Sequence, residues 1–252
     1  VIILLLTIYF LKKESPTPEI ISLKNWKVTT ESAFRKDQMR FERVRKAYAE
    51  KEVFIKKLLT SKGIHSFDYD LFLRAFKKEE ILEVWIKEKS NTSFRLLTSY
   101  TFCKNSGKLG PKRKEGDHQI PEGLYRINHF NPKSNFLLSL RVNYPNASDK
   151  VLSHPTTPGS DIYVHGGCQT VGCIPITNEK IQELYILAVE AHEADAPISI
   201  HIFPTKNWSE ILKVDHPHFA FWKNLKVGFD LFEENRTISA FEVSEDGAYK
   251  FR

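Results

Sequence analysis

The chain has 252 residues, of which 41% are hydrophobic and 12% aromatic. This composition is typical of a globular protein with a sizeable core and excludes a disordered chain. The formal net charge of +6 is dispersed along the sequence, and no DNA- or RNA-binding motif accompanies it. The charge therefore does not indicate a nucleic-acid partner, although it suits an anionic polymer or a membrane surface. The length predicts one large domain, or a catalytic domain with an extension.

The first residues form an apolar segment. Residues 1–11 are apolar apart from Thr7, and Lys12 and Lys13 follow. The run is short for a membrane-spanning helix but suits a signal peptide or an N-terminal anchor. No small-residue cleavage site follows, which favours an uncleaved anchor; the alternative is a buried strand. We expect residues 1–13 to contact a membrane and the protein to be exported to the cell envelope or periplasm.

A linker and a helix are predicted next. Residues 15–19 contain two prolines and read as a linker, and Thr30 can cap the helix that follows. Apolar residues recur at helical spacing as far as Ser61, and Gly63 is expected to end the helix. The opposite face of this helix is rich in Arg and Lys, and we interpret it as solvated rather than as a binding surface.

The hydrophobic period changes to two at Tyr69. Three alternating runs with turn signals at residues 77–80 and 89–92 predict a β-meander that ends near Tyr100. Further strands are expected at 136–141 and 198–203, with His201 as a structural or edge residue, and a helix is expected over 181–191. The tail is predicted to form helices at 208–214 and 219–232 and a final strand near 240–243 or 249–251.

A long loop rich in glycine and proline precedes the second half of the chain. It runs over residues 106–125, and Pro121-Glu122-Gly123 in it predicts a turn. Glu115 and Asp117 could suggest a catalytic carboxylate pair. We interpret them instead as residues that hold the loop in place.

The most informative stretch runs from Asp161 to Thr177. Residues 162–164 predict a short strand with His165 at its end, and Cys173 opens a second short strand before a helix at Thr177 or Asn178. Gly166 and Gly167 allow the chain to turn between the two strands. A histidine and a cysteine that face each other across such a loop have the arrangement of a thiol nucleophile and its base.

Several interpretations of this cysteine differ in the chemistry they imply. As a nucleophile, Cys173 would form an acyl-enzyme with His165 as base, and the free amides of Gly172 and Cys173 would stabilise the oxyanion. Cys173 could instead be a buried small hydrophobe. A zinc site is a further alternative, but its spacings match no standard zinc module, so no metal and no cofactor are expected. A catalytically silent wall-binding domain is the remaining alternative. The zinc ligands in question would be His154, His165, Cys168 and Cys173.

Two motifs resemble those of a known family. The pattern His165-Gly166 followed by Thr170-Val171-Gly172-Cys173 is similar to the signature of the YkuD-type L,D-transpeptidase catalytic domain, in particular its YafK-like subgroup. The family loop Gly-Pro-Lys, Glu-Gly-Asp and Pro-Glu-Gly-x-Tyr is matched over 110–125, and Tyr-Pro-Asn at 144–146. The chain departs from most members in having Val171 where they have a second histidine, and Ile174-Pro175 where they have an Arg/His-Asn pair.

The resemblance implies an α+β fold with a β-rich catalytic sheet, flanking helices and an N-terminal helical extension. It implies an L,D-transpeptidase-type cysteine acyltransferase that acts on peptidoglycan stem peptides, with a backbone carbonyl near Gly166 or Gly167 orienting His165. Thr170 would shape the loop, and Tyr144 and Tyr163 could line the substrate groove. An amine acceptor gives transpeptidation and water gives amide hydrolysis; both outcomes stay open. The expected division is an anchor (1–13), a linker and basic helix (14–66), a catalytic domain (67–204) and a C-terminal extension (205–252).

The chain has three cysteines, and the enzyme hypothesis requires Cys173 to be a free thiol. Cys103 and Cys168 then remain as a possible disulfide, which an exported protein can maintain. Alternatively, Cys168 lies close enough to Cys173 to modulate it. The sequence does not choose between these two arrangements.

Overall fold

The computed structural model describes residues 23–27, 29–192 and 197–252, and its centre is one mixed sheet of eight strands. The strand order is β3-β2-β1-β8-β4-β5-β6-β7, with parallel pairing only for β1–β8 and β6–β7. The predicted anchor (1–13) and linker (15–19) lie outside the described residues. Among the described helices, none is both long and apolar enough to cross a membrane. The strands are β1 (Tyr69–Phe76), β2 (Ile81–Glu88), β3 (Arg95–Thr101), β4 (Gly123–Asn131), β5 (Ser139–Val142), β6 (Ile162–His165), β7 (Ile174–Pro175) and β8 (Ser199–Phe203).

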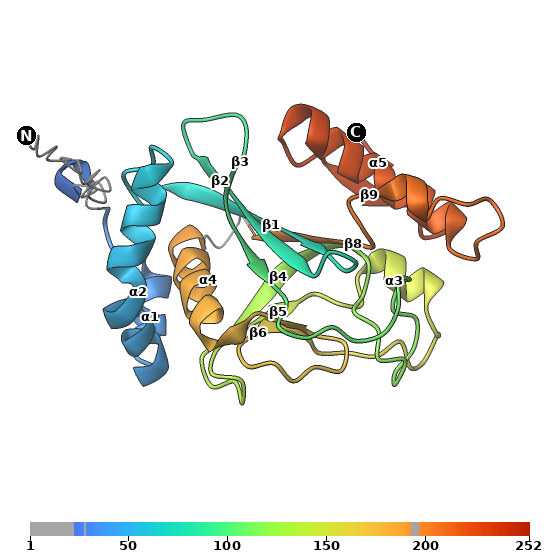
Figure 1. Cartoon of the computed structure of the whole chain (residues 1–252), viewed down its shortest axis with the longest axis horizontal. Helices are drawn as coiled ribbons and strands as arrows, with labels where there is room; N and C mark the ends of the chain where they lie inside the picture. The colour runs from blue at the N-terminus through green and yellow to red at the C-terminus, as the bar shows by residue number, and fades with distance from the viewer. Residues whose placement is uncertain (1–22, 28, 193–196) are drawn as a thin grey trace, which may run out of the picture.

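Helices cover the sheet unequally, as Figure 1 shows. The large apolar core lies between the sheet and α4 (Thr177–Ala191), with α1 (Ala33–Gln38) and α2 (Glu42–Ser61) packed outside α4. Helix α3 (Ala147–Leu152) follows β5, and α5 (Phe219–Asn235) lies at the other end of the molecule, near the C-terminus. The architecture is the expected α+β fold, with a β-rich sheet, flanking helices and helices before the sheet.

The helical region before the sheet differs from the prediction at its start. Ser32, not Thr30, is the N-cap, because its Oγ accepts the Arg35 amide at 3.0 Å. The predicted single helix is also wrong, since the backbone is extended at Phe41 and divides α1 from α2. The predicted end is confirmed: Gly63 has φ +74° and donates to the Thr60 carbonyl. Glycine at this position closes the helix without a Cβ clash.

The β-meander is confirmed, with β1, β2 and β3 pairing antiparallel in sequence order. The strand predicted over 136–141 is shifted, because Leu137 has φ +72° and pairing starts at Ser139. Strand β4 and helix α3 were not predicted. In the tail, residues 208–214 form only a 3-10 turn at Trp208–Glu210, whereas both candidate strands exist and pair as β9 (Phe241–Val243) and β10 (Tyr249–Phe251).

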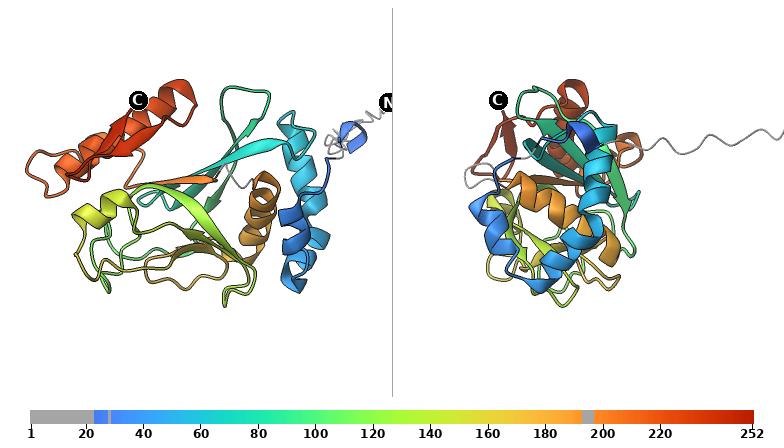
Figure 2. Two further views of the ribbon diagram at one scale, coloured as in Figure 1. Left: turned by 180° about the vertical axis from the view of Figure 1, so that it is seen from behind. Right: turned by 90° about the vertical axis from the view of Figure 1, so that its left-hand side faces the viewer.

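The C-terminal segment packs on the sheet face opposite α4, as the two views in Figure 2 show. The Trp222 side chain of α5 is buried with Phe76 and Phe203, and its indole donates to Glu122 Oε2 at 2.7 Å. Lys77 donates to the other oxygen of Glu122 at 3.0 Å, so this buried carboxylate has a cation and two further donors around it. His201 is buried and lies on the interior strand β8, not at an edge of the sheet.

Alternation along the strands gives the sheet two chemically different faces near β5 and β6. Leu140 and Val164 belong to the core under α4. Their neighbours along the strands point to the other face, because successive side chains of a strand alternate. Ser139 pairs with His165 on that face, and Arg141 pairs with Tyr163. This polar face contains the candidate site.

Candidate active site

The histidine and the cysteine of the central motif line one cavity. His165 ends β6 and pairs with Pro175 of the parallel strand β7, and Cys173 directly precedes β7. The two side chains share the wall of a cavity of about 190 Å³. Cys173 lies two residues before the partner of His165, so the short parallel pairing places both side chains on the same face of the sheet and in the wall of one cavity. The other lining residues are Asn131, Ser134, Asn135, Phe136, Ser139 and Tyr163.

The His165 ring is held in one orientation and one tautomer. Its Nδ1 lies 2.6 Å from the Gly166 carbonyl oxygen, which can only accept, so Nδ1 carries the proton. The ring stacks on Phe136 with 4.4 Å between centroids. Burial lowers the pKa of His165, and the hydrogen bond to Gly166 offsets this only in part. The imidazole is therefore neutral at neutral pH, with its lone pair on Nε2.

The Nε2 atom is the one ring position that remains free. It is buried and has no hydrogen-bond partner among the described residues. An unsatisfied buried acceptor is costly unless it has a functional partner. Since the cavity that His165 lines also contains the Cys173 thiol, a proton from that thiol is the chemically obvious partner.

The Cys173 thiol is free and contacts the backbone of β6. Its sulfur accepts from the Tyr163 amide at 3.4 Å and donates to the Asp161 carbonyl at 3.6 Å. Burial raises the pKa of Cys173, and the Tyr163 amide opposes this shift by stabilising the thiolate. The resting site is therefore a thiol beside a neutral imidazole rather than an ion pair.

The loop before Cys173 is closed by hydroxyl groups. Thr170 Oγ1 accepts the Cys173 amide at 2.9 Å and donates to the Cys173 carbonyl at 2.8 Å. The Gly172 amide donates to Ser106 Oγ at 2.8 Å. The expectation that the amides of Gly172 and Cys173 are free is therefore wrong, because two hydroxyls already occupy them. Because Thr170 bonds both backbone groups of Cys173, its hydroxyl fixes the shape of this loop.

The glycines after His165 are required by close packing. A Cβ on Gly166 would come within 2.6 Å of the Phe136 carbonyl and of Asn178 Oδ1. Gly167 has φ +67°, and its amide donates to Asn178 Oδ1 at 2.9 Å. Sequence reasoning missed the supporting residues Asn178, Phe136 and Ser106. Only Ser106 had a local signal, as the residue before the Gly107 turn.

The remaining cysteines form a disulfide between Cys103 and Cys168. The bond joins the loop before Cys173 to the long loop after β3. Cys168 is thus no free thiol near Cys173, and it cannot serve as a thiolate ligand for a metal. Within the described ranges, no three His, Cys, Asp or Glu side chains group together in a way that could hold a metal ion.

The loop over 106–125 is held by Asp117, as predicted. Its carboxylate accepts from Lys112 Nζ at 2.6 Å and from the amides of Arg113, Lys114 and Gln119. Burial raises the pKa of Asp117, but these donors outweigh it and hold the pKa below its ordinary value. Asp117 is therefore an anchor of the loop.

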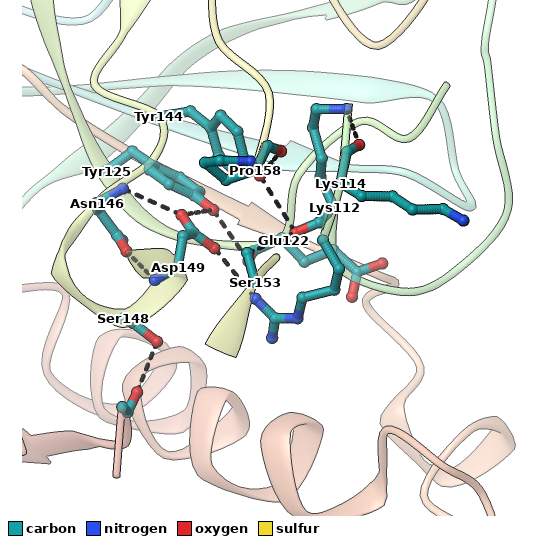
Figure 3. A network of polar contacts seen from close by, with 12 residues as sticks. Lys112, Lys114, Glu122, Tyr125, Tyr144, Asn146, Ser148, Asp149, Ser153 and Pro158 are labelled. Atoms are coloured by element: carbon teal, nitrogen blue, oxygen red, sulfur yellow. Dashed lines mark hydrogen bonds and ion pairs between the residues drawn. The ribbon is translucent and has the colours of Figure 1, made fainter. Parts of the chain in front are cut away.

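The two tyrosines expected in the groove lie in different places. Tyr163 lines the cavity of the thiol. Tyr144 is buried, donates to the Pro158 carbonyl at 2.7 Å and borders a separate cavity. Figure 3 shows it beside the polar network around Asp149, whose carboxylate accepts from the Tyr125 hydroxyl at 2.9 Å. Burial raises the pKa of Asp149 to about 6.

Comparison with known proteins identifies the family of this chain. Residues 76–199 match the model of the YkuD L,D-transpeptidase catalytic domain. The chain is 32% identical over 171 residues to "Putative L,D-transpeptidase YafK" from Escherichia coli strains K12 and O157:H7, covering 66% of this chain and 68% of each relative.

Similar solved structures include two further bacterial proteins. The helical cell shape determining protein Pgp2 from Campylobacter jejuni has a TM-score of 0.44 and 20% identity, covering 66% of this chain and 57% of that one. Bdellovibrio bacteriovorus Bd1075 has a TM-score of 0.41 and 23% identity, with 66% and 58% covered. The chain thus spans less than two thirds of either structure. On the family match and the extent of the identity to YafK, the chain belongs to the family of YkuD-type L,D-transpeptidase catalytic domains.

Proposed function

We propose that the protein is a cysteine-dependent acyltransferase that acts on peptidoglycan stem peptides, with Cys173 as nucleophile and His165 as base. The observation that carries this proposal is the state of His165. Its Nδ1–H is bonded to Gly166, and its buried Nε2 has no partner among the described residues. His165 and the free Cys173 line one cavity. Family membership supports the peptide of the cell wall as substrate.

The reaction begins with transfer of the thiol proton to Nε2 of His165. The thiolate attacks the carbonyl carbon of a stem-peptide amide, and the C–N bond breaks as the imidazolium returns the proton to the leaving amine. The product is a thioester on Cys173. In the resting structure the thiol is bonded to the Asp161 carbonyl, so a change of the Cys173 side-chain torsion has to precede proton transfer. The hydrogen bond between a catalytic thiol and its base is often formed only in the substrate complex.

Stabilisation of the oxyanion requires a rearrangement as well. The Gly172 and Cys173 amides are the donors closest in sequence to the nucleophile, and Ser106 and Thr170 occupy them in the resting structure. Ser106 is on a different segment, so its hydroxyl can be displaced from Gly172 by the substrate oxygen without opening the Thr170 loop. The Gly172 amide is therefore the stronger candidate donor, and Tyr163 is the candidate groove residue at the cavity.

Resolution of the thioester decides between two outcomes. An acceptor amine that loses its proton to His165 gives a new cross-link, and water gives a trimmed peptide; both release the Cys173 thiol. We place the activity at the cell envelope, where this substrate is found. Residues 1–13, which lie outside the described residues, would anchor the protein to the membrane. The boundaries of the catalytic domain (67–204) and the extension (205–252) stay a prediction.

Incubation with disaccharide-tetrapeptide muropeptides tests the proposal, with products followed by mass spectrometry. The wild type should give cross-linked or trimmed products and a transient mass adduct on Cys173. Cys173→Ala should give neither, and a matched Cys103→Ala/Cys168→Ala variant controls for loss of a cysteine elsewhere. Activity that Cys173→Ala fully retains would refute the nucleophile, whereas binding of the muropeptide without turnover even by the wild type would favour a silent wall-binding domain.

A further inference from the structure

A second, larger cavity lies on the same sheet face as the thiol. Its volume is about 770 Å³, and it is bordered by β4, β5, α3 and the C-terminal strand β9. Phe241 and Val243 of β9 form part of its wall. These two residues lie outside the range 76–199 that matches the family domain, so the C-terminal segment completes this cavity.

Strand register connects the two cavities. Ser139 and His165 face each other in the cavity of the thiol, and one cross-strand step further Arg141 faces Tyr163. Arg141 lines the larger cavity. Asp161 links the two directly, because its carbonyl accepts from the Cys173 thiol while the residue borders the larger cavity. These two pairs are two residues apart along each strand, a distance of about 7 Å, which two residues of an extended peptide can span.

The larger cavity is lined by an excess of positive charge. Arg126, Arg141 and Lys150 border it, against the single carboxylate of Asp161. Arg141 is partly engaged, since its Nε donates to Asn128 Oδ1 at 3.0 Å and a terminal nitrogen lies 4.0 Å from Asp161. Arg126 and Lys150 are exposed, and neither is paired with a carboxylate within the part of the chain that the structure describes.

The amides around these cations suit a peptide. Asn128 and Asn143 line the same wall, which gives amide groups for a peptide backbone beside charges that recognise carboxylates. Asn146 also lines it, but its side-chain N–H groups already donate to the Leu124 carbonyl and the Tyr249 hydroxyl. All three amides are already ordered: Asn128 Oδ1 accepts from Arg141 Nε, Asn143 Oδ1 accepts the Arg126 amide, and the Asn146 amide group donates to the Leu124 carbonyl. Figure 3 shows Asn146 beside Asp149, whose amide donates to Asn146 Oδ1. These hydrogen bonds fix the orientation of the amide side chains in the wall of the cavity.

We propose that this cavity binds carboxylate groups of the peptide whose reacting amide lies at Cys173, with Arg126 and Lys150 as the main recognition residues. The assignment rests on the proposed function, because it takes the ligand to be an acidic peptide that extends from the thiol. Through Phe241 and Val243, the C-terminal segment then contributes to substrate specificity.

Binding measured on the Cys173→Ala variant tests the cavity without turnover. The probes are a disaccharide-tetrapeptide muropeptide and the same molecule with its carboxylates amidated. In that background, Arg126→Gln/Lys150→Gln should raise the Kd of the acidic probe about tenfold, since two charge-assisted contacts are lost. Lys213→Gln/Lys223→Gln, on the exposed surface of the C-terminal segment, is the matched control and should leave the Kd unchanged.

The outcomes separate the two proposals. Equal Kd values in the two double variants, or equal affinity for the amidated probe, would overturn the cavity assignment even if Cys173 catalyses turnover. Displacement of the probe by inorganic phosphate at a similar concentration would also overturn it, because it would indicate a general anion site. A selective loss of binding together with an inactive wild type would support the cavity and refute only the proposed reaction.

Discussion

The two faces of the sheet at β5 and β6 differ in what covers them. On one face, Leu140, Val142, Ile162 and Val164 are fully or almost fully buried under α4. On the other, a helix covers only the distant end of the sheet, and the side chains near β6 line two cavities. The same four-residue strands build both faces, since their side chains alternate.

Each of these two faces has a histidine, and comparing them shows what a histidine needs in order to act as a base. His192 is packed on the covered side, where its ring lies 3.9 Å from Phe34, and burial lowers its pKa. Burial lowers the pKa of His165 too, but Gly166 fixes its tautomer, and the residue lines a cavity that the Cys173 thiol also lines. A neutral imidazole is thus common to both faces, half-buried at His192 and buried at His165. The shared cavity is what makes His165 a candidate base.

The largest expected effect is that of His165→Gln. We expect kcat/KM for muropeptide turnover to fall about a thousandfold, within the range for loss of a general base. His192→Gln is the matched control from the covered side and should retain most of the activity. Circular dichroism and thermal unfolding should show that both variants are folded. Comparable losses in the two variants would mean that the histidines act through stability and would remove the distinction between the faces.

Most of the site could be predicted because its signals are local. His165, Gly166, Gly167 and Cys173 lie within nine residues, and the strand-turn-strand pattern around them depends on backbone preferences of those residues alone. The position of the helix that starts at Thr177 followed from the same stretch. Local patterns therefore predicted which two side chains line one cavity.

The partners that come from distant segments could not be predicted. Ser106 reaches Gly172 across 66 positions in the sequence, and the Gly172 amide was for this reason wrongly expected to be free. Strand β4 was missed because Pro121-Glu122-Gly123 indicated a turn where pairing with β8 begins. Both errors have one cause: long-range hydrogen bonds decide how a loop or a glycine is used, and a single sequence does not show them.

A second prediction concerns how the reactivity of Cys173, on the polar face, depends on pH. Burial raises the pKa of Cys173 above its ordinary value and lowers that of His165 below its own, so the pair is thiol and neutral imidazole at pH 7. Only the thiolate reacts with iodoacetamide, and its fraction rises about tenfold per pH unit until the pH reaches the pKa of the thiol. The rate of Cys173 alkylation should therefore keep rising beyond about pH 8.5, where a thiol of ordinary pKa begins to level off. Mass spectrometry at a series of pH values measures this rate. A plateau already below pH 7 would indicate a thiolate-imidazolium pair and contradict the assignment.

The smallest expected effect comes from Thr170→Val, which keeps the shape of the side chain and removes its hydroxyl. The two hydrogen bonds between Thr170 Oγ1 and the backbone of Cys173 are lost, each worth about 1 kcal/mol. One change opposes the other: the loop that positions the thiol loosens, while the Cys173 amide becomes free for an oxyanion. We expect the loosening to prevail, since the sulfur depends on the same residue's backbone for its position, and kcat/KM to fall about fivefold. Thr170→Ser, which keeps the hydroxyl, should stay close to the wild type. A rise in kcat for Thr170→Val alone would instead identify the Cys173 amide as the oxyanion donor that the threonine occupies in the resting enzyme.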